Sequence, residues 1–170
     1  MEIVEIGNGG KLSYDRIGAM KLMYPFIVDS NKISTMFLYD LFEGKIVNAS
    51  HVSHDSKEIM YEIEPNDHVA FELNCDVNEC SLNLYEIKVH VELIDYNGYE
   101  QYETTGVNVS KVYSTNFDRH RFRSFSNDND TPNILAFVLA YLVPFDLPYV
   151  YYHFLTTDEV VKEIKRFFES

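Results

Sequence analysis

The chain has 170 residues, of which 46% are hydrophobic and 15% aromatic, and its formal net charge is −13. This length fits one domain, and the hydrophobic share excludes a wholly disordered chain because it is large enough to form a buried core. The negative charge argues against direct binding to nucleic acid or to an anionic membrane, and it favours either a basic partner or simple solubility.

Residues 1–30 are predicted to be an N-terminal arm or a short helix, and residues 31–170 to form one domain. Asn8-Gly9-Gly10 is typical of a turn, and Ser13 is a candidate cap for a helix that ends before Pro25. The apolar face of this helix would consist of Ile17, Met20 and Tyr24. Residues 1–10 lack the pattern of a signal peptide, and no apolar stretch reaches the ~20 residues of a membrane span, so a cytoplasmic location is expected.

The middle of the chain is predicted to form an antiparallel sheet. Residues 33–42 are rich in apolar and aromatic side chains and are predicted to be a strand buried on both faces. Residues 69–75 alternate apolar and polar side chains, as a half-buried strand does. Residues 85–112 are predicted to be a long hairpin that turns at Asn97-Gly98 and has a bulge at Gly106. Shorter strands are expected at residues 45–47 and 60–63.

Three short patterns suggest chemistry, and each has a simpler interpretation. Residues 51–55 (HVSHD) resemble part of a metal site, but no further ligand follows at a recognisable spacing, so a polar loop is preferred. Cys75 and Cys80 are too few for a disulfide framework or a zinc site, and Cys75 is interpreted as a small buried residue. Residues 117–125 interleave arginine with phenylalanine, but at this net charge pairing with carboxylates is preferred to nucleic-acid binding. No catalytic residue, metal or cofactor is assigned, and the chain is not expected to be an enzyme.

The C-terminal part is predicted to contain two helices. Thr131-Pro132 is a typical helix start, and the helix that runs to Leu142 is apolar nearly all round. Such a helix must be covered on every side, so a homo-oligomer, either a dimer or a tetramer, is expected. Pro144 and Pro148 then break the helical pattern, and an amphipathic helix begins at Thr156.

Between His68 and Phe168 the order of elements resembles the SecB export-chaperone family. The matching features are the strand HVAFELNC, the hairpin that begins LYEIKVHVEL, the Pro-Asn-Ile-Leu helix start and the connection VPFDLPYVYYHF. The resemblance implies an α+β fold, with an antiparallel sheet of about four strands and two C-terminal helices packed on it. It also implies an ATP-independent holdase that binds unfolded or extended polypeptides through a groove, without a cofactor.

On this resemblance the client-binding groove would be lined by apolar side chains from the sheet, the first helix and the connection. They are Phe71, Leu73, Phe137, Tyr141, Phe145, Leu147, Tyr149, Tyr151 and Phe154. For each of them ordinary core packing is an alternative. Two other functions remain open. One is an acidic inhibitor or immunity-type protein, such as a viral or phage mimic of nucleic acid, that blocks a basic surface. The other is an enzyme, whose site would be a pocket with convergent polar groups.

Overall fold

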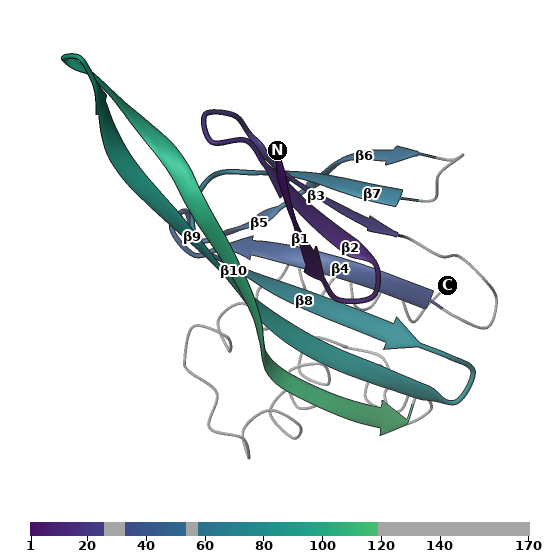
Figure 1. The fold of residues 1–170 in the computed structure, drawn as a ribbon. Helices are drawn as coiled ribbons and strands as arrows, with labels where there is room; N and C mark the ends of the chain where they lie inside the picture. The colour runs from purple at the N-terminus through teal and green to yellow at the C-terminus, as the bar shows by residue number, and fades with distance from the viewer. Residues whose placement is uncertain (26–32, 54–57, 119–170) are drawn as a thin grey trace.

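The computed structural model describes residues 1–25, 33–53 and 58–118, which form ten strands in two antiparallel sheets (Figure 1). The first sheet has the order β1-β2-β3-β7-β6. Its strands, in that order, are Glu2–Ile6, Gly10–Tyr14, Met20–Pro25, Glu58–Ile63 and Ala49–Ser53. The second sheet has the order β10-β9-β8-β4-β5. Its strands are Tyr99–Asp118, Glu79–Tyr96, His68–Cys75, Ile33–Asp40 and Lys45–Val47.

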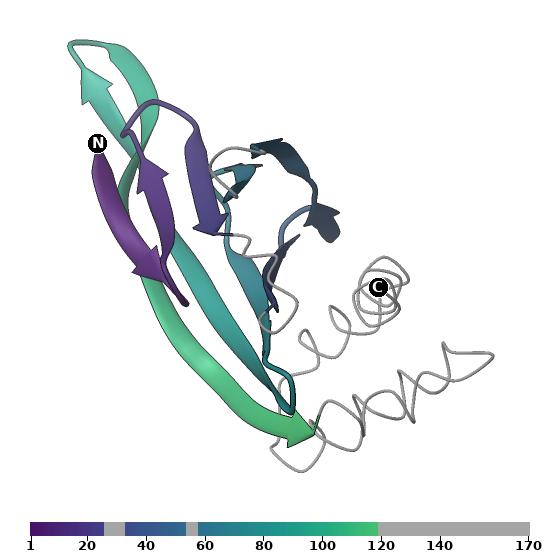
Figure 2. The ribbon, with the colours of Figure 1, turned by 90° about the vertical axis from the view of Figure 1, so that its right-hand side faces the viewer.

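The hydrophobic core lies between the two sheets, which Figure 2 shows from the side. The first sheet contributes alternate residues of its strands, including Leu12, Tyr14, Met20, Leu22 and Tyr24. The second sheet contributes Met36, Leu38, Ala70, Tyr85 and Ile87. Both sets follow the period of two that places alternate side chains of a strand on one face.

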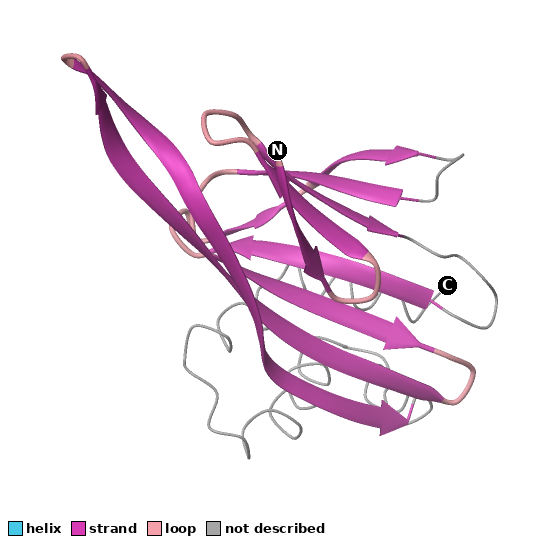
Figure 3. Ribbon diagram, in the orientation of Figure 1, coloured by secondary structure: helices cyan, strands magenta, loops and turns pink. Residues whose placement is uncertain are grey.

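The predicted α+β class is wrong for the part of the chain that the structure describes. Figure 3 shows only strands and connecting loops there, and the single sheet of about four strands is replaced by two sheets of five. The two predicted C-terminal helices lie outside the described residues. The α+β architecture implied by the resemblance to the SecB family is therefore overturned by an all-β arrangement.

The short helix predicted from Ser13 is also wrong. In residues 10–14 and 20–24 every second side chain is buried, while Lys11 and Lys21 between them are exposed, which is the pattern of a half-buried strand. Ile17, expected on the helix face, lies in the turn between β2 and β3 and is largely exposed. The predicted turn before β2 is confirmed, with positive φ at Gly7 and Gly9.

The predicted strands of the second sheet are confirmed, and β4 and β8 are buried on both faces. The alternation in β8 predicts one solvent-exposed face, and this is wrong. The polar side chains of His68 and Glu72 are both fully buried. The predicted hairpin turn has positive φ at Asn97 and Gly98, and the register shifts between Thr104 and Gly106 as the predicted bulge requires. The hairpin is longer than predicted, since β9 begins six residues earlier, at Glu79.

Candidate functional site

Only two of the predicted client-binding residues lie in the described part of the chain, and both are buried. Phe71 and Leu73 on β8 are each 2% exposed, and the ring of Phe71 lies 5.6 Å from that of Phe37. They offer no surface to a client. The other predicted members lie outside the described residues: Phe137, Tyr141, Phe145, Leu147, Tyr149, Tyr151 and Phe154.

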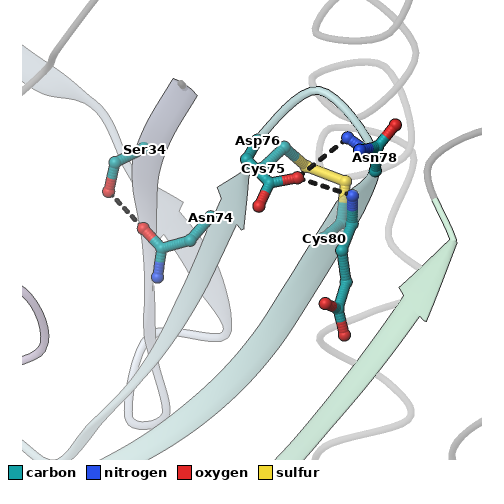
Figure 4. The surroundings of a disulfide bond; sticks show 7 residues. Ser34, Asn74, Cys75, Asp76, Asn78 and Cys80 are labelled. Carbon is teal, nitrogen blue, oxygen red and sulfur yellow. Dashed lines mark hydrogen bonds between the residues drawn. A yellow bond between two sulfur atoms is a disulfide. The ribbon is translucent and has the colours of Figure 1, made fainter. Parts of the chain in front are cut away.

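The short patterns considered for chemistry take other roles. Residues 49–53 are strand β6 rather than a polar loop, and residues 54–57 lie outside the described part. Within the described residues no three side chains are arranged to hold a metal, and no helix is long and apolar enough to cross a membrane. Cys75 and Cys80, directly opposite each other on β8 and β9, form a disulfide. Cys75 is buried as predicted, but as half of a disulfide (Figure 4).

A projecting arm at the end of the second sheet is the most distinctive surface feature. Strand β8 begins at His68, opposite Ile87, so the part of β9 after Ile87 pairs only with β10. Figure 1 shows this end of the hairpin extending beyond the other strands. We call residues 90–105 the arm. Its root is held by two hydrogen bonds: the Val89 N–H donates to Asp67 at 3.0 Å, and the Thr104 N–H donates to the Arg16 carbonyl at 2.9 Å.

The arm exposes a concentration of large apolar side chains. Five of the twelve that are exposed within the described residues lie here: Val91, Leu93, Tyr96, Tyr99 and Tyr102. Leu93 is 49% exposed and Tyr102 is 71% exposed, and they are a cross-strand pair on one face of the hairpin. Clustered exposed apolar side chains with a polar surround are typical of protein-binding surfaces.

The charges of the arm are all negative. Asp95 lies directly opposite Glu100, and Glu92 lies directly opposite Glu103. No lysine or arginine occurs in the sequence between Lys88 and Lys111. Like charges directly opposite each other destabilise a sheet, so each pair weakens the hairpin that carries it.

Two of the four carboxylates accept hydrogen bonds within the arm, and one Asp95 oxygen accepts the Gly98 backbone N–H at 2.8 Å. Glu103 is buried, and its Oε1 accepts a hydrogen bond from the Tyr96 hydroxyl at 2.6 Å. This hydrogen bond raises the pKa of Tyr96, so the hydroxyl remains a donor. The second oxygen of Glu103 has no hydrogen-bond partner. The other three carboxylates are exposed.

No family model matches the chain, and no curated protein matches it. Among solved structures, ORF157 from Acidianus filamentous virus 1 is similar, with a TM-score of 0.52 and 17% identity over 89% of this chain and 98% of that one. An engineered protein gives a TM-score of 0.51 and 15% identity over 89% of this chain and 95% of its own. The likeness is one of fold alone. At such low identity it transfers no function, and it gives no support to the predicted resemblance to the SecB family.

Proposed function

We propose that the protein binds a partner protein with a basic and partly apolar surface, and that the arm is its binding element. The observation that carries this proposal is the directly opposed pair of exposed carboxylates, Asp95 and Glu100, beside the exposed Leu93 and Tyr102. Of the functions predicted from the sequence, this corresponds to the acidic inhibitor or immunity-type protein.

The opposed Asp95 and Glu100 make sense if a cation from outside the chain neutralises them. In the free protein these two carboxylates repel each other, and a lysine or arginine of a partner placed between them would remove that repulsion on binding. The exposed Leu93 and Tyr102 would supply the apolar contact, and aromatic side chains are enriched at the energetic centres of interfaces. The arm therefore combines a charge for steering with an apolar anchor.

A second copy of this chain fits the arm less well than a basic partner. Two arms brought together would place their carboxylates side by side, with no cation between residues 88 and 111 to separate them. The predicted homo-oligomer stays a prediction, and if it forms it would use a surface other than the arm. Extended polypeptide clients without basic residues would likewise leave the opposed carboxylates unpaired.

Site-specific photo-cross-linking tests the proposal. A photoreactive amino acid is placed at position 102 on the arm and, as a control, at position 42, where Phe42 is an exposed aromatic residue outside the arm. Both proteins are illuminated in extracts of the source cell, and the products are identified by mass spectrometry. We expect a basic protein to cross-link at position 102 and not at position 42, with a yield that falls as salt is raised.

A charge variant then separates binding from folding. Glu92→Gln combined with Glu100→Gln removes one carboxylate from each opposed pair, and Glu5→Gln combined with Glu62→Gln removes two exposed carboxylates elsewhere. The arm variant should bind the partner roughly tenfold more weakly. Its free energy of unfolding should nevertheless rise by up to about 1 kcal/mol, because the repulsion within each pair is removed. The control variant should bind normally. Equal products at positions 42 and 102, a second copy of this chain as the product, or an unchanged yield in the arm variant would each contradict the proposal.

The predicted cytoplasmic location belongs to the same proposal. The disulfide between Cys75 and Cys80 is the observation against it, since such bonds usually persist in oxidising compartments. Binding by the arm does not depend on the compartment, because no cysteine lies within residues 90–105.

A further inference from the structure

The outer edge of β9 in the arm has backbone hydrogen-bonding groups that no strand of the described residues uses. β8 lies beside β9 only as far as Ile87 (Figure 1). Two residues further on, the Val89 N–H points to the β8 side, because it donates to Asp67 Oδ1 at 3.0 Å. The backbone groups of an antiparallel strand alternate in direction with a period of two. The N–H and C=O groups of Val91 and Leu93 therefore point to the same side, past the start of β8.

This edge of β9 is better suited to pairing than the outer edge of β10. Both register shifts of the hairpin place the extra residue in β10, so β9 runs without a bulge from the root of the arm to its turn. At the root the outer side of β10 is occupied, because the Thr104 N–H donates to the Arg16 carbonyl. Residues 89–96 of β9 contain neither proline nor glycine, so every one of them keeps its backbone N–H. A regular open edge of this kind can accept a further strand.

The side chains along this edge determine which strand can pair there. Val91 and Leu93 lie on one face of β9 and are 40% and 49% exposed. Ile94, on the other face, is half-buried, and its neighbour on that face, Glu92, is exposed. Asp95 is also exposed, and although one of its oxygens accepts a backbone N–H of the turn, this hydrogen bond does not remove the negative charge. The two carboxylates repel an acidic strand, including the β9 edge of a second copy, and they favour a strand with cations opposite them.

We propose that the partner adds a strand to the arm, antiparallel to β9 in the place that β8 leaves open. This inference rests on the proposed function and specifies the partner's binding segment. From its N-terminus the segment has a basic residue opposite Asp95 and two apolar residues opposite Ile94 and Leu93. A second basic residue then lies opposite Glu92, and an apolar residue lies opposite Val91. Opposite charges and apolar pairs on directly opposed residues stabilise an antiparallel pair, and the direction is the one in which β8 already pairs with β9.

A synthetic peptide with this pattern tests the inference on the unchanged chain. The probe is the acetylated and amidated peptide Thr-Lys-Val-Val-Lys-Val-Thr, and the control peptide has glutamate in place of both lysines. In the free chain the Val91 and Leu93 amides should exchange hydrogen faster than those of Glu92 and Ile94, which point toward β10. At near-saturating concentration the lysine peptide should slow exchange of the Val91 and Leu93 amides at least roughly tenfold, with saturable shifts in ¹H–¹⁵N NMR spectra. The glutamate peptide should cause neither change.

Two N-methylated peptides separate strand pairing from contact through side chains alone. In the proposed register the second valine of the peptide is opposite Leu93, and its N–H points to β9. The first valine is opposite Ile94, and its N–H points away. Methylation of the second valine nitrogen should weaken binding at least roughly tenfold, and methylation of the first, the matched control, less than about threefold.

Three results would overturn the inference: no saturable shifts with the lysine peptide, equal effects of the two methylations, or Val91 and Leu93 amides that stay unprotected in the complex. The cross-link at position 102 does not require strand pairing. A basic protein captured there would therefore leave the proposed function intact even if the peptide results overturned this inference. Conversely, a peptide that pairs as expected, without any basic protein captured at position 102, would contradict the proposed function alone.

Discussion

Replacing Glu72 with glutamine tests whether one buried carboxylate joins the two sheets. Glu72 on β8 is fully buried. Its Oε2 accepts hydrogen bonds from the Asn8 backbone N–H at 3.0 Å and the Tyr24 hydroxyl at 2.5 Å, both from the first sheet and its turn. Its Oε1 accepts from Asn83 Nδ2 at 3.0 Å and the Tyr85 hydroxyl at 3.2 Å, both on β9. Four donor groups are therefore directed at the two carboxylate oxygens of Glu72.

The size of the effect follows from what an amide offers in place of a carboxylate. Glutamine keeps one oxygen, and its –NH₂ group must face either the Asn8 N–H or the Asn83 Nδ2 group, both of which are donors and cannot accept. Burial and the bond to Glu72 raise the pKa of Tyr24, and burial raises the pKa of Tyr85 to about 12, so both tyrosines stay protonated at neutral pH. One or two hydrogen bonds are lost and a buried donor is left unpaired, which together cost about 2–5 kcal/mol.

Unfolding in urea measures this loss as a change in the free energy of unfolding. Glu62→Gln is the matched control, because Glu62 is exposed on β7 and the chemical change is identical. It should change the free energy of unfolding by less than about 0.5 kcal/mol. If Glu72→Gln is as stable as Glu62→Gln, the reasoning fails, and the network around Glu72 does not hold the sheets together.

Two further predictions concern buried groups of the second sheet. His68 is fully buried, and this burial lowers its pKa below 6.5 despite the Asn66 carbonyl at 2.7 Å from Nδ1 and Asp40 at 3.7 Å from Nε2. The unfolded chain then binds the proton more readily, so stability is complete above pH 6.5 and is lost as the pH falls toward the lowered pKa of the folded state. The urea midpoint of a His68→Gln variant should depend less on pH below 6.5, and an unchanged pH dependence would contradict this. The double variant Cys75→Ser, Cys80→Ser opens a disulfide loop with a sequence separation of 5, which should lower the free energy of unfolding by about 2 kcal/mol. Reductant should lower the free energy of unfolding of the unchanged protein to that of the variant, and it should leave the variant unaffected. Equal stability of the two proteins without reductant would contradict the prediction.

Local patterns predicted the strands well because their period and turn chemistry are local properties. Asn97-Gly98 adopts the positive φ angles that a tight hairpin requires, and Gly106 marks the bulge. The fold class failed for a different reason. Ser13 to Tyr24 also satisfies a helical spacing, and only pairing of β3 with the distant β7 decides between helix and strand. Single-sequence patterns contain no information about that partner.

The candidate site was harder to predict than the strands. Alternation in β8 was recognised correctly, but its polar side chains were assigned to solvent, whereas Glu72 is the centre of a buried network. A signal was available for the arm: the sequence between Lys88 and Lys111 has four carboxylates and no cation. What the sequence did not show is that β8 begins only at His68, opposite Ile87, so that β9 has no β8 partner beyond this point. Exposure of the arm is a consequence of unequal strand lengths.

The β9–β10 hairpin presents the Leu93 and Tyr102 pair of the arm and part of the core on one face because β10 changes register twice. The shift between Thr104 and Gly106 places Tyr102, before it, and Val107, after it, on the same face, although they are an odd number of residues apart. The second shift, between Lys111 and Tyr113, brings Ser114 onto that face, where its hydroxyl donates to Asn83 at 2.6 Å. Without the first shift Tyr102 would exchange faces relative to the core, since a slip of one residue inverts a strand. The set of β10 side chains that shares a face with the core therefore depends on two extra residues in this strand.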